Sequence, residues 1–452
     1  MVSPGGLRTS CKTEPTHSGR PLQSAVAAPV SRTMARGLGE MLKVLMLTPH
    51  LDVVGGTERQ CLKLATALAH HGVETTILTM RPTEHSRANV PADIAITRLD
   101  SPGVWVRRMK RYLRAKRAIS PNYSEGRAGV AGNQPSRSFL RELGSLVGHK
   151  IPTQIDEAFL ERTITRLCSA TDVVHLHGVF WLPMLRATAR ACRATNTPYL
   201  VKITNEPERT WRSLKADPAA VGALSTSSGI ITVNKHTQGY FQCRFPHVPT
   251  HFIPNGTDIP TQSPVAPIRD VLFLGTLKKQ KGVDVLMRAW AMTKCTDGHR
   301  LLIVGDGPER RALEDLARSL GIEPRVRFLG LRHDVDQLLA RRRVFVLPSR
   351  WEGMPNALIE AMAHGLPCIS TSVDGVTDVL DDGKSGLLVE PENPKALALA
   401  LDRVLTDHAM ASRLGGYARA RVIQRFSILA IIKEYMQLYE KFLVRHPNPR
   451  LG

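Results

Sequence analysis

Two glutamates lie eight positions apart where the sequence predicts a loop and a helix. Glu352 follows an apolar run that ends at Leu347, and Glu360 lies in a helical segment that begins near Asn356 and ends at Gly365. The free N–H groups at a helix start, with the positive end of the helix dipole, favour a diphosphate. One carboxylate can then face a sugar while the other accepts hydrogen bonds from ribose hydroxyls. For an isolated pair of this kind, an ordinary helix acid and a loop charge would be the simpler explanation.

Glycines near these positions allow a ligand to approach the backbone. Gly353 directly follows the first glutamate, and Gly55-Gly56 follows an apolar run and opens a predicted helix. A side chain would keep a phosphate away from the backbone, so glycine suits such a loop. A plain turn between strand and helix explains Gly55 and Gly56 equally well.

A pair of aspartates, Asp334 and Asp336, has the spacing that some metal-dependent enzymes use for manganese. The pair follows a turn at Gly330 and opens a helical stretch, where helix N-capping explains it. Lysines and helix dipoles can neutralise a diphosphate without a metal. We therefore expect no metal site.

Alternating strands and helices must position these residues. The apolar runs suit buried parallel strands, and such strands need covering helices. The sequence therefore predicts two open, doubly wound α/β sheets in tandem, with the ligand site at the strand ends in the cleft between them. No G-x-G-x-x-G is present, so we expect no dinucleotide cofactor. The strands are expected at 44–47, 75–78, 173–176, 199–203 and 230–233 and then at 271–274, 301–304, 326–329, 344–347 and 368–370.

The chain has 452 residues, which suggests more than one domain. A Pro-rich stretch at 260–267 is typical of a linker, and the last helix is expected at about 427–443. We expect a disordered arm at 1–40 and an N-terminal Rossmann-like domain at 41–262 with a basic insertion at 101–150. A C-terminal Rossmann-like domain follows at 263–426, and a final helix with a tail occupies 427–452.

The net charge of +21 favours an acidic partner such as phosphate groups or an anionic membrane. Residues 101–150 hold eleven Lys or Arg and two acidic residues, and 105–117 would form a cationic amphipathic helix suited to a membrane surface. A solvated insertion explains the same segment. Seven scattered cysteines, with no C-x-x-C pair, indicate a reducing compartment. We expect a cytoplasmic protein that contacts the inner face of the membrane peripherally.

The segment from Glu352 to Ala363 resembles the E-G-x-P-x-x-x-x-E-A-M-A signature of retaining glycosyltransferases of family 4, which have the GT-B fold. The resemblance covers about 41–445 and implies two Rossmann-like domains that face each other across a cleft, with the C-terminal helix returning to the N-terminal domain. It also implies a metal-independent transfer of a hexosyl group from a nucleotide-diphosphate sugar, without a bound cofactor. The implied acceptor is a lipid-linked or polysaccharide intermediate.

The resemblance assigns roles residue by residue. It places Glu352 at the donor sugar, Glu360 at the ribose and His177 close to the sugar, although a lone histidine at a strand end is more often structural. It places the diphosphate near Lys281 in a lysine-rich loop, which could also be a solvated turn. The family often has Arg at position 276. Donor contacts are further implied for Gly353, Met354, Pro355, Asn356, Ala357, Gly55, Gly56, Gly275 and Thr276.

Rival functions remain open at this point. Another GT-B enzyme, such as a phosphorylase or an epimerase, would share the fold. A basic, non-catalytic protein that binds nucleic acid or an anionic membrane through 101–150 would share the charge. Aromatic residues make up only 5% of the chain and no nucleic-acid-binding motif is found, so we expect no nucleic-acid partner. Lys202, which lies in the predicted strand 199–203, receives no role.

Overall fold

The structure is a computed structural model that describes residues 41–51, 56–82, 94–98, 157–179, 181–261, 270–294, 298–341 and 344–445. These residues all belong to one unit, Met41–Gly452. The predicted arm at 1–40, the basic segment 101–150 with its proposed membrane helix at 105–117, and Gly55 lie outside the described residues.

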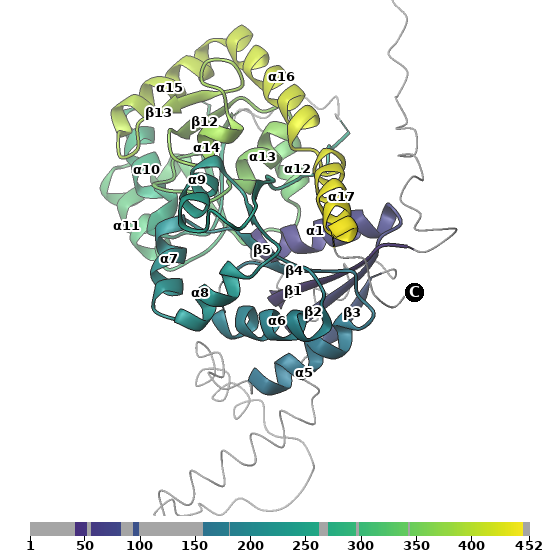
Figure 1. The fold of residues 1–452 in the computed structure, drawn as a ribbon. Coiled ribbons are helices and arrows are strands. Elements are labelled where there is room, and N and C mark those ends of the chain that lie inside the picture. Colours follow the sequence, from purple (N-terminus) through teal and green to yellow (C-terminus); the bar gives the residue numbers. More distant parts are fainter. Residues whose placement is uncertain are drawn as a thin grey trace, which may run out of the picture. The chain divides into compact units, whose positions relative to one another are not determined.

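The first sheet has seven parallel strands in the order β3-β2-β1-β4-β5-β6-β7 (Figure 1). This order is that of a doubly wound Rossmann-like sheet, in which the strand order reverses between β1 and β4. The side chains of β4 and β5 are buried throughout, including those of His175, His177 and Lys202. The strands are β1 (Lys43–Leu51), β2 (Glu74–Pro82), β3 (Ala95–Arg98), β4 (Val173–His177), β5 (Tyr199–Ile203), β6 (Gly229–Thr232) and β7 (Thr250–Phe252).

The second sheet has six parallel strands in the order β10-β9-β8-β11-β12-β13, and its order reverses between β8 and β11. Each sheet has its own cluster of buried apolar side chains, so two hydrophobic cores are present. The predicted pair of tandem α/β domains is confirmed. The strands are β8 (Asp270–Leu274), β9 (Arg300–Val304), β10 (Val326–Gly330), β11 (Val344–Leu347), β12 (Cys368–Thr371) and β13 (Leu387–Val389).

Helices cover both sheets (Figure 1). Four of them begin with a side chain that accepts a hydrogen bond from a free N–H of the first turn: Asp217, Asn234, Asn393 and Asp407. The helices around the first sheet are α1 (Gly56–His70), α5 (Glu157–Cys168), α6 (Leu182–Thr195), α7 (Pro207–Lys215), α8 (Pro218–Ser225) and α9 (Lys235–Arg244). Those that follow are α10 (Val283–Met292), α11 (Arg310–Ser319), α12 (Val335–Ala340), α13 (Asn356–Ala363), α14 (Val376–Val379), α15 (Pro394–Thr406), α16 (His408–Arg425) and α17 (Ile428–Arg445).

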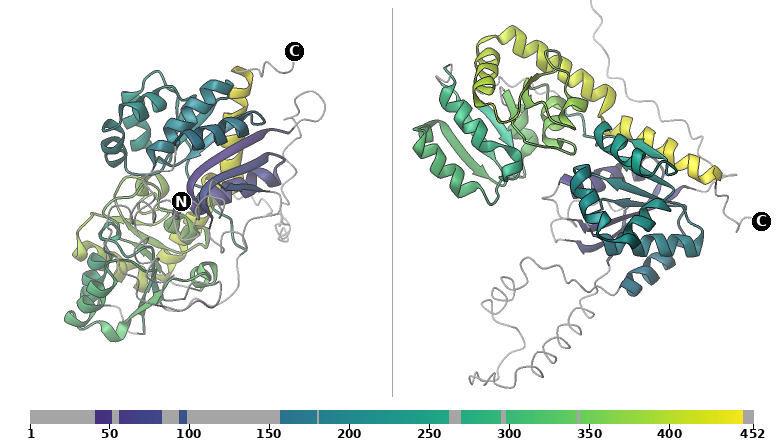
Figure 2. Two further views of the ribbon diagram at one scale, coloured as in Figure 1. Left: turned by 90° about the horizontal axis from the view of Figure 1, so that it is seen from below. Right: turned by 60° about the vertical axis from the view of Figure 1, so that its left-hand side comes forward.

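The last helix leaves the second half of the chain and packs on the first. In Figure 2, α17, drawn in yellow, lies along the first sheet, against α1 and β4. Its Tyr439 is fully buried, and the hydroxyl lies 2.8 Å from Nδ1 of His175. The chain passes between the halves at two adjacent places, since Thr257 N donates to Phe426 O at 2.9 Å and Ile428 N donates to Thr257 O at 2.8 Å. The predicted return of the C-terminal helix is therefore confirmed.

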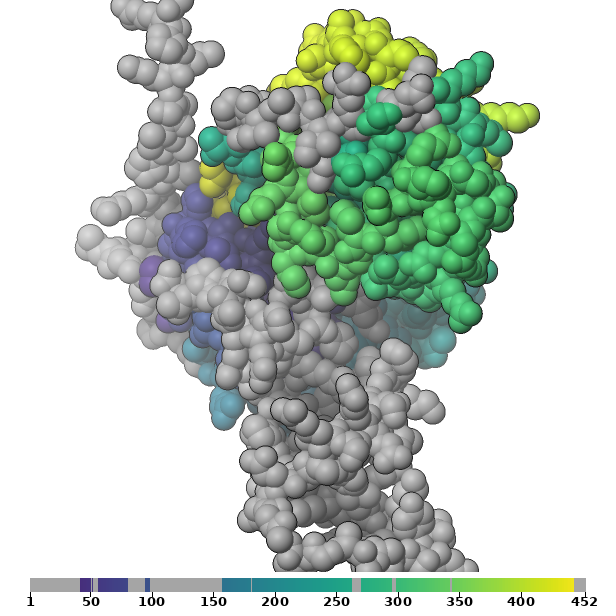
Figure 3. Space-filling model, turned by 180° about the vertical axis from the view of Figure 1, so that it is seen from behind, coloured from purple at the N-terminus to yellow at the C-terminus, as the bar shows by residue number. Residues whose placement is uncertain are grey.

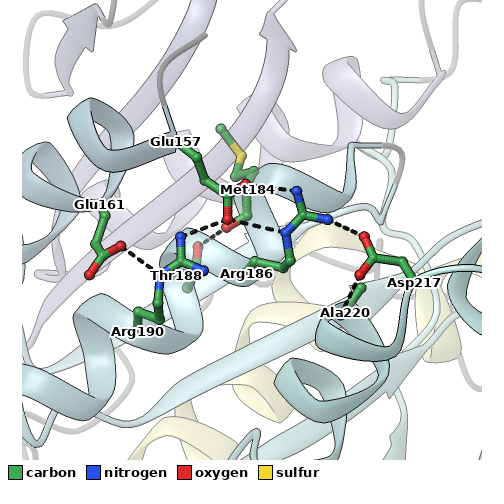
Figure 4. A network of polar contacts seen from close by, with 8 residues as sticks. All are labelled: Glu157, Glu161, Met184, Arg186, Thr188, Arg190, Asp217 and Ala220. Atoms are coloured by element: carbon green, nitrogen blue, oxygen red, sulfur yellow. Dashed lines mark hydrogen bonds and ion pairs between the residues drawn. The ribbon is translucent and has the colours of Figure 1, made fainter. Parts of the chain in front are cut away.

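An arginine network joins three helices of the first half (Figure 4). Arg186 of α6 donates two hydrogen bonds to Glu157 of α5, at 3.1 and 2.7 Å, and also contacts Asp217 at the start of α8. Arg190 donates to Glu157 and to Glu161, both at 2.6 Å. The hydrogen bonds from Arg186, with those from Arg190, lower the pKa of Glu157 despite its burial. The network fixes α5 against α6.

We predict that Arg186→Met lowers the free energy of unfolding by about 2 kcal/mol, because it leaves two half-buried carboxylates without their shared partner. Arg190 is twice as exposed (44% against 22%), so the matched control Arg190→Met is expected to lose less than about 1 kcal/mol. A depressed carboxyl pKa stabilises the fold above its unfolded value and stops doing so as pH falls through the folded value. Urea unfolding should therefore show a smaller effect of Arg186→Met well below pH 4.5 than at pH 7. An equal effect at both pH values would contradict this account.

Candidate functional site

The site lies where the strand order of each sheet reverses. Loops that follow β1 and β4 in the first sheet, and β8 and β11 in the second, carry the residues that the sequence singled out. Ligands bind at such positions in open α/β sheets because adjacent loops diverge there. The space-filling view shows purple atoms from the start of the described chain directly against green atoms of the second half (Figure 3).

Glu352 and Lys281 meet in this site, as the implied donor contacts require. The carboxylate of Glu352 is buried, and its Oε1 accepts hydrogen bonds from Lys281 Nζ at 2.5 Å and from Ser349 Oγ at 2.6 Å. Both bonds go to Oε1, so Oε2 receives no hydrogen bond from the residues that the structure describes. The Lys281 side chain is 20% exposed and can turn toward a ligand, whereas the Glu352 side chain is 4% exposed and is held.

The loop that carries Glu352 is fixed to the lysine-rich loop. Arg350 donates to both oxygens of Asp284 at 2.9 Å, and its backbone N–H donates to Gln280 O at 2.8 Å. Gln280 Nε2 in turn donates to the carbonyl oxygen of Trp351 at 3.0 Å. Gly282, with φ of +60°, allows this approach, because a Cβ there would lie 2.0 Å from the oxygen of Pro348. The backbone of the lysine-rich loop is therefore fixed against the loop that carries Glu352, whereas the side chains of Lys278 and Lys279 are exposed.

Glu360 faces two cations of the opposite half. Its side chain is buried on α13, and its Oε1 lies 3.7 Å from Arg59 Nη2 and 3.8 Å from Lys63 Nζ, both on α1. Its Oε2 is buried and has no hydrogen-bond partner among the described residues. A buried carboxylate oxygen without a partner is costly, so this atom is suited to accept a hydrogen bond from a ligand.

Gly353 brings the backbones of the two halves together. A Cβ at this position would lie 2.3 Å from the carbonyl oxygen of Thr204, just after β5. On the same glycine, the carbonyl oxygen accepts a hydrogen bond from Asn234 Nδ2 at 2.6 Å. Asn234 also accepts a bond from Thr237 N at the start of α9. The glycine is required for this contact between the loops.

Not every residue from Met354 to Ala357 can offer a backbone N–H to a donor. Pro355 has no N–H, and the N–H of Asn356 donates to Met354 O at 3.0 Å. The amides of Met354 and Ala357 are the remaining candidates. The side chain of Asn356 reaches the first half instead, where its Nδ2 lies 3.3 Å from the carbonyl oxygen of Gly56.

His177 is enclosed. Its ring has no exposed surface, and neither nitrogen forms a hydrogen bond with a described residue. Burial lowers the pKa of His177 well below its usual value, helped by Lys202 and opposed by the backbone of Thr57. The imidazole is therefore neutral at physiological pH. A ring without exposed surface can touch a sugar only if its neighbours move. The contact between His177 and the sugar therefore remains a prediction, and it requires such a movement.

Gly275 and Thr276 follow β8 as predicted. Gly275 N donates to Val304 O at 3.0 Å, and its own carbonyl oxygen would lie 1.9 Å from a Cβ on Gly305, which has φ of +126°. Thr276 is exposed and offers no charge where the family often has Arg. Among the described residues, Lys281, Arg59 and Lys63 bring cationic groups to the two glutamates, and of these three only Lys281 was expected.

The expected N-cap at Asp334 is not formed. Asp334 occupies the position before α12, but its side chain does not cap the helix and instead pairs with Arg332 at 2.7 and 2.8 Å. The guanidinium of Arg332 binds both carboxylate oxygens of Asp334 side by side, and this bidentate pair competes with the cap. Asp336 lies 3.3 Å from His364 Nε2. Among the described residues, no group of three or more His, Cys, Asp or Glu side chains could hold a metal ion.

Several residues of the site were missed by sequence reasoning: Arg59, Lys63, Thr204, Asn234, Asn255 and Ser349. Thr204 and Asn234 come shortly after the predicted strands 199–203 and 230–233, so their position at strand ends was a usable signal. Arg59 and Lys63 lie on one face of α1, four positions apart, and the sequence gives no sign that this face meets α13.

Two family models match the chain in tandem. Residues 55–256 match a glycosyl transferase 4-like domain, and residues 268–407 match glycosyl transferases group 1. Together the two matches take in more than half of the chain. The protein belongs to the group 1 glycosyltransferases with the GT-B fold.

Individual relatives agree with this assignment. A lipopolysaccharide core biosynthesis glycosyltransferase of Rhizobium meliloti is 34% identical over 40% of this chain and 51% of its own length. The chain spans about half the length of the first curated relatives it matches. An alpha-D-kanosaminyltransferase of Streptomyces kanamyceticus is 24% identical over 84% of this chain and 97% of its own length.

The fold is also that of solved structures. Anabaena HepE, crystallised with UDP and glucose, superposes with a TM-score of 0.65 at 20% identity, over 88% of this chain and all of HepE.

In the part of the chain that the structure describes, every helix is too short or too polar to span a bilayer.

Proposed function

We propose that this protein is a retaining glycosyltransferase that moves a hexosyl group from a nucleotide-diphosphate sugar to a glycan or lipid-linked acceptor. The observation that carries the proposal is the pair of buried glutamates at α13. Glu352 is held by Lys281 and Ser349, and Glu360 has a buried oxygen that lacks a partner. A ribose hydroxyl would satisfy Glu360 Oε2, and a sugar would lie beside Glu352.

The chemistry follows from the charges around these groups. The start of α13 and the cations Lys281, Arg59 and Lys63 would stabilise the negative charge on the departing nucleotide diphosphate. The held carboxylate of Glu352 would orient the sugar and stabilise positive charge that develops at its anomeric carbon. The acceptor hydroxyl would attack the anomeric carbon from the face that the diphosphate leaves, which gives retention, and an oxygen of the departing diphosphate would take its proton. Closure of the two halves would exclude water that otherwise hydrolyses the donor.

The acceptor class is proposed from the relatives. Two of them are named for lipopolysaccharide core biosynthesis, which supports an acceptor that belongs to a polysaccharide or a lipid-linked glycan. Peripheral contact with an anionic membrane through 105–117 remains a prediction, because that segment lies outside the described residues. Nothing in the described residues favours the alternative of a non-catalytic binding protein.

A thermal-shift screen against UDP-, GDP- and ADP-sugars tests the proposal. A donor present at 100 times its Kd should stabilise the folded state by about 2.7 kcal/mol, and one nucleotide series should do so far better than the others. The hydrolysis product, the free nucleoside diphosphate, serves as a positive control for the phosphate and ribose contacts. Failure of every sugar nucleotide and every free diphosphate to shift the midpoint would contradict the proposal.

A further inference from the structure

A lysine with almost no exposed surface lies beneath the site. Lys202, on β5, is 2% exposed, and its Nζ donates a hydrogen bond to Asn255 Oδ1 at 3.0 Å. The same Nζ lies 5.5 Å from the ring centroid of Tyr435 on α17. Burial lowers the pKa of Lys202 to about 7, and Cys61 opposes this shift. A buried ammonium with one hydrogen-bond partner is destabilising, so its presence calls for a role other than packing.

The hydrogen bonds that begin at Lys202 continue into both halves of the protein. Asn255 Nδ2 donates to Asn356 Oδ1 at 2.8 Å, and Asn356 Nδ2 lies 3.3 Å from the carbonyl oxygen of Gly56. We call the series Lys202, Asn255, Asn356 and Gly56 the amide relay. It joins the end of β5, the segment before the second sheet, the first residue of α13 and the first residue of α1.

The ends of the amide relay fix the direction of every hydrogen bond in it. A protonated lysine only donates, so Asn255 must present its oxygen to it and its NH₂ group to Asn356. Asn356 must then present its own oxygen to Asn255, which leaves its NH₂ group for Gly56 O, a group that only accepts. Both asparagines are therefore held in a single orientation. Without the ammonium, the side-chain amide of Asn255 could rotate by about 180° and exchange its oxygen and NH₂ group, and the amide of Asn356 could then rotate in the same way.

The relay ends where the donor is proposed to bind. Asn356 and Gly56 begin the two helices whose N-termini face the site, and a Cβ on Gly56 would lie 3.1 Å from Asn356 Nδ2. Lys202 and Asn255 are themselves buried, and Asn255 is hydrogen-bonded to Asn356. The relay can therefore set the spacing of the two helix starts without contact with a ligand.

We propose that Lys202 is a positioning residue, which acts through Asn255 to orient Asn356 and so holds the start of α13 at the start of α1 in the donor-binding arrangement. The consequence for donor binding rests on the proposed function, whereas the relay itself does not. Loss of the relay should weaken donor binding, because the relay ends at the two helix starts that are proposed to face the phosphates.

Lys202 is expected to change charge near neutral pH, whereas the titratable groups around it are not. His175 and His177 of β4 face it, and burial, together with Lys202, keeps the pKa of His175 at about 3 and that of His177 well below its usual value. Burial raises the pKa of Cys61 on α1 to about 12 and raises that of Tyr435 further. Because the folded pKa of Lys202 is below its unfolded value, the stability of the fold should rise with pH between about 7 and 10.5.

The test combines Lys202→Met with Asn356→Ala, singly and together. For the donor identified in the thermal-shift screen, each single variant should raise KM about five- to tenfold with kcat changed less than about threefold. The double variant should be no worse than the poorer single variant, because both break the same relay. Lys202→Met should also remove the rise in stability between pH 7 and pH 9 in urea unfolding. Lys215→Met, on the exposed side of α7, is the control and should show neither effect.

Asn255→Asp separates positioning from packing. An aspartate at 255 still accepts from Lys202 but cannot donate to Asn356, so the donor KM should rise as in Lys202→Met although the hydrogen bond to Lys202 is kept. A wild-type KM in Asn255→Asp, or KM effects that multiply in the Lys202→Met, Asn356→Ala double variant, would overturn the inference.

The relay can also be tested without any ligand. The free energies of unfolding of Lys202→Met, Asn356→Ala and the double variant should be non-additive, and additive values would overturn the relay. Should wild type bind no sugar nucleotide, the proposed function fails while this stability cycle still decides whether the relay exists.

Discussion

Glu352→Gln is expected to lower kcat for sugar transfer by about 10²- to 10³-fold, which is the scale of loss when one preorganised charge or donor is removed from a transition state. The substitution keeps the size of the side chain and removes its charge. In the structure that charge is buried and is held by Lys281 at 2.5 Å and Ser349 at 2.6 Å. Glutamine can still accept from both groups, so the folded state should survive.

The measurement is steady-state kinetics with the donor from the thermal-shift screen. Because the sugar would contact Glu352 most strongly in the transition state, the loss should be found in kcat with a smaller change in KM. Glu314→Gln is a matched control, since Glu314 is also ion-paired, at 2.9 Å from Arg310 Nε, but lies on α11 at the surface. Full activity of Glu352→Gln would exclude this glutamate from the chemistry.

Gly353→Ala is expected to lower kcat/KM by about 10²-fold, because a displacement of about 1 Å in a catalytic arrangement has effects of this size. A Cβ at 353 would lie 2.3 Å from the carbonyl oxygen of Thr204, so one of the two loops must move. The hydrogen bond from Asn234 Nδ2 to Gly353 O would be disturbed at the same time. Each sheet keeps its own core, so the variant should fold.

Gly416→Ala provides the control. Gly416 lies inside α16, and a Cβ there would meet nothing within 4 Å. This substitution should leave transfer unchanged and raise the free energy of unfolding by about 0.5–1 kcal/mol, since alanine is the better helix former. If Gly353→Ala were as active as Gly416→Ala, the close contact between the two loops would have no part in transfer.

Local patterns in the sequence predicted much of the fold. The mainly apolar runs, such as 199–203 and 344–347, became strands with those same bounds, because a strand buried on both faces consists mostly of apolar side chains. The helix from Asn356 was also predicted, and Gly365, with φ of +77°, follows its end. The short strands β3, β7 and β13 were missed. Each has only three or four residues, and β7 and β13 are only partly buried, so none of them has a long apolar pattern.

The contacts that assemble the site could not be predicted in this way. Lys281 and Glu352 are 71 positions apart, and Asn255 and Asn356 are 101 apart. These contacts depend on how distant segments of the chain pack against each other, and the local spacing of apolar residues carries no information about that packing. His177 was correctly placed at a strand end, but its enclosure depends on neighbours that are distant in the chain.

The two adjacent crossings of the chain between the halves restrict how the protein can open. Thr257 and Ser427 lie side by side as an isolated bridge, and a Cβ on Gly256 would lie 3.0 Å from the Cα of Ile428. Two linked crossings hold the halves together at one place, so we expect the site to open by a rotation about the crossings and not by sliding. The hydrogen bonds Asn234–Gly353 and Asn356–Gly56 also join the halves, so an opening rotation has to break them.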